Sequence, residues 1–175
     1  MHPVIELYQG KRSVPLPNGT QLSLSDLWHL HPAIIGDGYF YIPWLFPITA
    51  PSSKWNRKIP LFSQEEAAYF ARQSDIQTNF LKSFDAIMDY FGIVRNEQRL
   101  IVKDEIMQRH YWLRNIGHES KKISRIIRSM AICGQPELAK NLQQLALKLG
   151  KEKGYIQPET LPIWEHIFDE FIKVP

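Results

Sequence analysis

The sequence predicts an all-α fold, a single irregular helical bundle preceded by a Pro-rich N-terminal segment of loops and short helices. Eight of the twelve prolines lie in the first sixty residues, where no long periodic segment occurs. The remainder repeats apolar residues at helical spacing between helix start and stop signals. Strand signals are weak, because the alternation around QLSLS and RLIVK is short and no hairpin turn separates paired runs.

The first long helices are predicted from residue 63 onward. Ser63 with Glu66 forms a capping-box pattern that opens SQEEAAYFAR, and Ser74 with Gln77 forms another. After Ser74, apolar residues recur at 3.6-residue spacing as far as Phe91, and Gly92 follows as a stop signal.

Four more helices follow in the second half. A helix of weaker period is predicted over 104–116, and an amphipathic helix over 119–132 ends at Gly134. Pro136 opens the next helix, which Gly150 closes, and Pro158 opens the last one. In that last helix Trp164, Ile167, Phe168 and Phe171 are predicted to face inward.

Bulk composition indicates one globular domain over residues 1–175. The 20.5 kDa chain is 44% apolar and 22% charged, close to the globular average. Its single cysteine, Cys133, excludes an intrachain disulfide and a cysteine-based zinc site. We expect a cytoplasmic location, since no signal-peptide pattern is visible and no apolar run approaches the ~20 residues that span a bilayer.

The stretch YFYIPWLFP, residues 39–47, is the most apolar in the chain, with five aromatic residues in nine. The favoured interpretation is core, with Tyr41, Ile42, Trp44, Leu45 and Phe46 filling the gap between helices. The alternative is a ligand-binding groove formed by Tyr41, Trp44 and Phe46, with His118 as a further contact. Gly36, Gly38 and Pro43 oppose a continuous helix here, so we expect the region to be bent or partly helical.

A basic stripe is predicted on the helix over 119–132. Lys121, Arg125 and Arg128 fall within about 60° on a helical wheel, with Lys122 beside them. Such a stripe is usually a solvated face. The alternative is an interaction face for nucleic acid or an acidic partner. Arg125 lies next to the apolar edge, which favours partial burial.

Catalytic and metal-binding patterns are weak. His29 and His31 do not share a helix face, and neither an HExxH nor a G-x-S-x-G motif occurs. The sequence therefore predicts no catalytic residue, no metal site and no cofactor. An enzyme of unrecognised type remains the least favoured of three function classes.

Several stretches resemble one known family. YFYIPWLFP resembles the YIQWLFP signature in the conserved N-terminal region of the opioid growth factor receptor family, and ESKKISRIIRSM, preceded by His118, resembles its HN-x-LRITRILKSL stretch. IQTNFLKSFDAIMDYFGI resembles the helix between them, while IELYQG and PNGTQLSLSDLW fit the front end in order and spacing. The resemblance covers roughly residues 4 to 147.

The resemblance implies a receptor-like binding module rather than an enzyme. The animal receptor of this family binds an enkephalin pentapeptide and associates with nuclear membranes, so a peptide or protein partner and peripheral membrane association are what the resemblance implies. It assigns no catalytic or ligand-contact residue to this chain, and it leaves the oligomeric state open.

Overall fold

The computed structural model describes residues 1–50, 59–103, 119–153 and 156–171. The helix predicted over 104–116 lies outside the described residues, as does His118. Within the described part, no helix has the length and apolar character that a membrane crossing requires.

The all-α prediction is wrong, because two small antiparallel sheets accompany the helices. β1 (Val14–Pro15) pairs with β2 (Gln21–Leu22), and β3 (Ile93–Asn96) pairs with β4 (Arg99–Val102). The second hairpin turns through Glu97 at a φ of +54°, a conformation for which glycine or asparagine is the usual signal. Without that signal, the short alternation around RLIVK did not indicate a hairpin.

The Pro-rich front contains the predicted short helices and loops, but it also contains the β1–β2 hairpin, which was not predicted. Its helices are α1 (Pro3–Tyr8), α2 (Leu24–Trp28), α3 (Pro32–Asp37) and α4 (Ile42–Leu45). α1 and α3 each begin with proline, after a histidine whose ring accepts a backbone N–H of the first turn. The region of residues 36–47 is interrupted rather than continuous, because α3 ends at Asp37 and α4 has only four residues.

The longer helices form the rest of the molecule. They are α5 (Gln64–Arg72), α6 (Ser74–Tyr90), α8 (Glu119–Ile132), α9 (Pro136–Lys153), α10 (Thr160–Glu165) and the 3-10 helix η2 (Ile167–Phe171). Ser63 and Glu66 form both arms of the predicted capping box. Gly92 and Gly134 have positive φ at the ends of α6 and α8, as their role as stop signals requires.

Three predicted helix ends are wrong. Ser74 is the first residue of α6 and not its cap, since Gln73 occupies the N-cap without a side-chain bond. α9 continues through Gly150 to Lys153. The last helix begins at Thr160 rather than after Pro158 and breaks into α10 and η2, which leaves Phe171 exposed.

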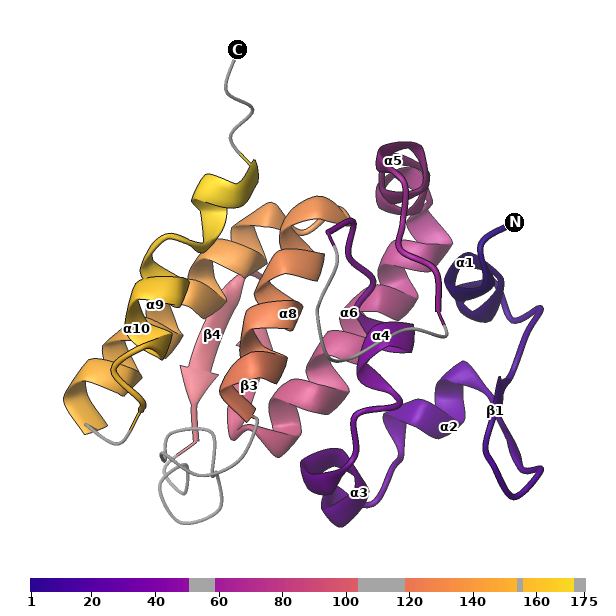
Figure 1. Cartoon of the computed structure of the whole chain (residues 1–175), viewed down its shortest axis with the longest axis horizontal. Coiled ribbons are helices and arrows are strands. Elements are labelled where there is room, and N and C mark those ends of the chain that lie inside the picture. Colours follow the sequence, from indigo (N-terminus) through magenta and orange to yellow (C-terminus); the bar gives the residue numbers. More distant parts are fainter. Residues whose placement is uncertain (51–58, 104–118, 154–155, 172–175) are drawn as a thin grey trace.

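The elements pack in two groups that a hairpin connects. α6 contacts α1, α2, α3 and α5, whereas α8 packs along α9, and α9 against α10. β3 lies against α6 and β4 against α9, so the β3–β4 hairpin joins the groups (Figure 1), and α5 also contacts α8 directly. The buried apolar side chains of both groups form one continuous cluster.

Candidate functional site

The aromatic stretch over residues 39–47 is mainly core. Tyr41, Ile42, Leu45 and Phe46 have no exposed surface, and Trp44 is half-buried against the same cluster. The ring of Phe46 lies 6.1 Å from the ring of Phe80 on α6. The core interpretation of this stretch is therefore confirmed for four of its five predicted members.

The backbone at the end of α4 is held by side chains from distant elements. The carbonyl of Leu45 accepts a hydrogen bond from the Tyr8 hydroxyl at 2.8 Å. The carbonyl of Phe46 accepts one from Nε of Arg125, also at 2.8 Å. Leu45 and Phe46 thus connect α1 with α8, which explains why a short apolar segment can act as the centre of the fold.

The predicted groove residues do not form an exposed surface together. Tyr41 and Phe46 are fully buried, and the Tyr41 hydroxyl donates a hydrogen bond to the carbonyl of Ile35. Trp44 is the member of the set that reaches the surface among the described residues. His118 lies outside the described residues, so its relation to Trp44 stays a prediction.

Lys122 is buried rather than part of an exposed basic stripe. It has no exposed surface, and its ammonium donates hydrogen bonds to the carbonyls of Ile35 at 2.6 Å and Gly36 at 2.8 Å. The same ammonium lies 4.8 Å from the ring centroid of Tyr39 and 5.7 Å from that of Tyr41. These contacts attach α8 to the end of α3.

Arg125 is buried as well, with 6% of its surface exposed. Burial, followed by the nearby positive charge of Arg128, lowers the pKa of Arg125 to about 10. Its Nη1 is buried and has no hydrogen-bond partner among the described residues. Of the four residues in the predicted basic face, Lys121 is exposed and Arg128 is partly exposed.

Arg128 is neutralised by the C-terminal segment. Its Nε and Nη2 donate to the two carboxylate oxygens of Glu170 at 2.9 and 2.8 Å. Glu170 lies in η2, which packs on α8. The charge of Arg128 is therefore paired within the chain.

We expect Arg128→Ala to lower the free energy of unfolding by less than about 1 kcal/mol, because exposed ion pairs contribute little. Glu170→Ala is expected to have an equally small effect. Urea denaturation followed by circular dichroism measures both. A loss of unfolding free energy several times larger would show that this ion pair is the main contact that holds η2 on α8.

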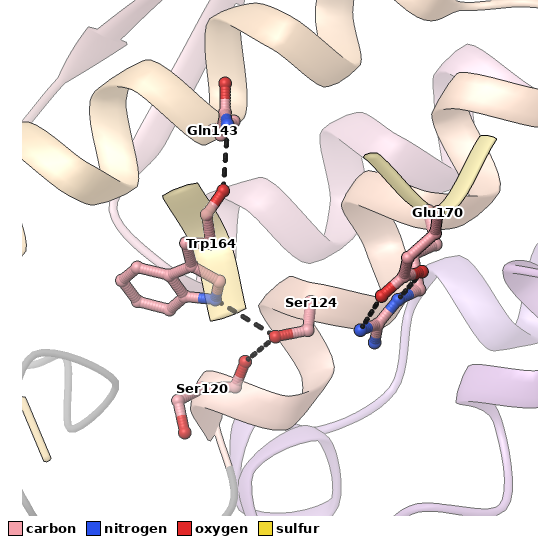
Figure 2. Close-up of polar contacts among 6 residues, drawn as sticks. Ser120, Ser124, Gln143, Trp164 and Glu170 are labelled. Carbon is pink, nitrogen blue, oxygen red and sulfur yellow. Dashed lines mark hydrogen bonds and ion pairs between the residues drawn. The ribbon is translucent and has the colours of Figure 1, made fainter. Parts of the chain in front are cut away.

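The C-terminal segment is attached more firmly through Trp164. Its indole Nε1 donates to Oγ of Ser124 at 3.0 Å, and Ser124 donates to the carbonyl of Ser120 (Figure 2). The Trp164 carbonyl accepts from the side chain of Gln143 on α9 at 2.8 Å (Figure 2). Trp164 thus lies between α8 and α9 with its polar atoms satisfied.

Two buried acidic groups of high pKa make the fold sensitive to alkali. Burial raises the pKa of the Cys133 thiol from 9.0 to about 12, and burial also raises the pKa of the Tyr8 hydroxyl from 10.0. Between these ordinary and folded-state values, the unfolded chain has lost protons that the folded chain still holds. The free energy of unfolding therefore falls as the pH rises above about 9.

We expect urea denaturation to show a clear loss of stability between about pH 8 and about pH 11. Cys133→Ala and Tyr8→Phe should each make that pH dependence shallower, because each removes one titrating group. A pH dependence that is unchanged in both variants would contradict this assignment.

An open pocket of about 360 Å³ lies where the end of α1, the start of α2 and the first turns of α6 meet. Its lining includes Gly10, Ser25, Trp28, Asp75 and Asn79. Its volume is at the lower end of the range of small-ligand pockets. It is a candidate binding site on the described surface, next to the core residue Tyr8.

The pocket is connected to the core segment through Ser83. Trp28 Nε1 donates to Oγ of Ser83 at 2.7 Å, and the hydroxyl oxygens of Ser83 and Tyr8 are 2.8 Å apart. Because Tyr8 has a single hydrogen and donates to the carbonyl of Leu45, Ser83 supplies the hydrogen between the two hydroxyls. This network holds the Trp28 ring in one orientation.

Sequence reasoning did not identify Trp28 or Asp75 as site residues. Trp28 lies on a five-residue helix, which is too short for apolar periodicity to be read. The available signal was the capping box of Ser23 and Asp26, which the structure contains in full and which places Trp28 in the second turn of that helix.

Comparison with known proteins agrees with the arrangement of these segments. The model of the opioid growth factor receptor conserved region matches residues 5–171. The mouse opioid growth factor receptor is 25% identical over 122 residues, which cover 67% of this chain and 19% of that protein. The human receptor is 27% identical over 124 residues, which cover 68% of this chain and 18% of that protein.

The chain therefore spans about a fifth of the length of these curated relatives. No solved structure matches it. The family model extends over nearly all of the described helices, including the core segment around Phe46 and the buried cations of α8. The chain belongs to the family of the opioid growth factor receptor conserved region.

Proposed function

We propose that this chain is a non-catalytic interaction module that binds a peptide or protein partner. The observation that carries the proposal is the family match over residues 5–171, because the relatives are named as receptors for the opioid growth factor. The chain covers only the conserved region of those receptors, so the proposal concerns a module and not the whole receptor.

The structure supports a division between scaffold and binding surface. The residues that carry the family resemblance most strongly, such as Phe46 and Arg125, are buried and hold the elements together. A partner therefore contacts residues on the surface of this scaffold. The candidates are Trp44 and the pocket between α1, α2 and α6 that Trp28 lines, called the Trp28 pocket below. Binding of nucleic acid through α8 has less support, because two of its four cations, Lys122 and Arg125, face inward.

Fluorescence anisotropy tests peptide binding directly. A labelled enkephalin-type pentapeptide is titrated with the protein, and unlabelled peptide is then added as competitor. We expect saturable binding of micromolar or tighter affinity, since the relatives are named as opioid growth factor receptors. A labelled peptide of the same composition in scrambled order is the control.

Anisotropy that does not saturate, or that is equal for the scrambled peptide, would contradict peptide binding of this kind. Trp44→Leu, which keeps an apolar side chain at the position, then tests whether Trp44 contributes to the contact. Loss of affinity at unchanged stability would assign it to the partner surface.

A further inference from the structure

The Trp28 pocket has an acidic residue in its lining and a lysine beside it. Among the described residues that line it, Asp75 is the charged one, while the ammonium of Lys82 lies outside the lining, over the Trp28 ring. The side chain of Asp75 is exposed and makes no hydrogen bond or ion pair with any other described residue. A solvated carboxylate of this kind is available to a positively charged ligand group, with which it forms a charge-assisted hydrogen bond.

Another open pocket of the described surface has charges of both signs in its lining. It has about 350 Å³, lies between α1 and α5, and contains Glu65, Glu66 and Arg72. Carboxylates and a guanidinium therefore occur together there. That pocket has no single sign of charge that would select a ligand.

The apolar part of the Trp28 pocket is rigid. Trp28 is half-buried, and its bond to Ser83 fixes the plane of the indole. The ammonium of Lys82 already lies 5.6 Å from the centroid of that ring. A second cation over the indole would be repelled by Lys82, so a ligand's charge belongs at Asp75 and its apolar group against the remaining surface of the indole and Leu24.

The size and the rim of the pocket limit the ligand to one residue or a group of similar size. A volume of about 360 Å³ is small for a binding pocket. Gly10 on the rim has a φ of +75°, and a Cβ placed there would meet no atom within 4 Å. The rim at α1 is therefore open to a chain that continues outward.

We propose that this pocket binds a cationic group joined to an aromatic side chain, with Asp75 pairing the charge and Trp28 contacting the ring. That the natural ligand is a peptide rests on the proposed function. The preference for a cationic aromatic group rests on the pocket alone, so the two are tested separately.

The probe is L-phenylalaninamide, which carries an ammonium and a ring, and N-acetyl-L-phenylalaninamide is its neutral counterpart. Two-dimensional ¹⁵N NMR spectra of the full chain are recorded during titration with each. We expect the cationic probe to shift the resonances of the Trp28 indole, Gly10 and Asn79, and the neutral probe to shift them at least about fivefold less at equal concentration.

Asp75→Asn is expected to weaken the response to the cationic probe to that of the neutral one. Glu137→Gln is the matched control, because Asp75 and Glu137 are each the second residue of a long helix and lie in its first turn. Both substitutions remove the same favourable interaction of a carboxylate with a helix N-terminus. The two variants therefore differ in that only Asp75→Asn removes the carboxylate proposed to bind the ligand.

Three results would overturn the proposal: equal shifts with the two probes, an Asp75→Asn response equal to that of the parent, or no shifts at the pocket with either probe. If the pentapeptide fails to bind while phenylalaninamide shifts the pocket in the expected way, the proposed function is wrong and the pocket assignment stands. If the pentapeptide binds but Asp75→Asn leaves the probe response unchanged, the proposed function stands and the pocket assignment is wrong.

Discussion

Phe46→Ala is expected to lower the free energy of unfolding by about 3 to 5 kcal/mol, the usual range for truncation of a buried aromatic residue. Phe46 has no exposed surface and packs against Phe80 of α6. Its carbonyl is bound by Arg125 of α8, so the surrounding backbone is held on both sides and has little freedom to collapse into the cavity. Urea denaturation followed by circular dichroism measures the loss.

Trp44→Ala is the matched comparison, because Trp44 belongs to the same short segment but is half-buried. Part of its ring stays in water after folding, so the expected loss is smaller than that of Phe46→Ala. A Phe46→Ala variant that unfolds at the same urea concentration as the parent would show that the segment is not the centre of the core. Equal losses of unfolding free energy for the two variants would show that the partial exposure of Trp44 does not reduce its contribution to stability.

The long helices could be predicted because their signals are local. α5, α6 and α8 each combine an apolar period with a cap or a glycine stop, and the structure places them within a residue or two of the predicted ranges. The second hairpin could not be predicted, since its turn depends on Glu97 adopting a conformation that its residue type does not indicate.

The orientation of the basic residues of α8 could not be predicted from a helical wheel. A wheel gives the angle of Lys122 relative to its own helix, but not which segment covers that angle. Here the covering segment is the end of α3, whose carbonyls at Ile35 and Gly36 lie 87 and 86 residues earlier in the chain. For the candidate site the limit is similar, because Trp28 and Asp75 meet only through the packing of α2 on α6.

Lys122→Met is expected to lower the free energy of unfolding by about 1 to 3 kcal/mol. Methionine has nearly the length of lysine, so the change removes the charge and the hydrogen bonds with little change in volume. The carbonyl of Gly36 then loses its donor, whereas the carbonyl of Ile35 keeps the Tyr41 hydroxyl, and an unsatisfied buried carbonyl costs about 1 to 3 kcal/mol. Relief of the cost of burying an ammonium offsets part of this loss.

Lys121→Met is the matched control, since the neighbouring side chain is exposed. Its expected effect is below about 0.5 kcal/mol, as for most surface substitutions. Urea denaturation of the two variants compares the buried and the exposed lysine in one helix. If Lys122→Met proved neutral, the cost of burying the ammonium would equal the gain from its contacts, which include the hydrogen bonds to α3.

Hydrogen exchange separates a local role of Lys122 from a general one. Its ammonium joins α8 to the end of α3, whose own backbone bonds include those from the amides of Ile34 and Ile35 to the carbonyl of His31. Loss of that attachment should speed exchange of these two amides more than exchange of the amides of α9, because Lys122 bonds to α3 directly, whereas α9 packs on α8. Equal acceleration throughout the chain would mean that Lys122 supports global stability and does not hold α3 in place.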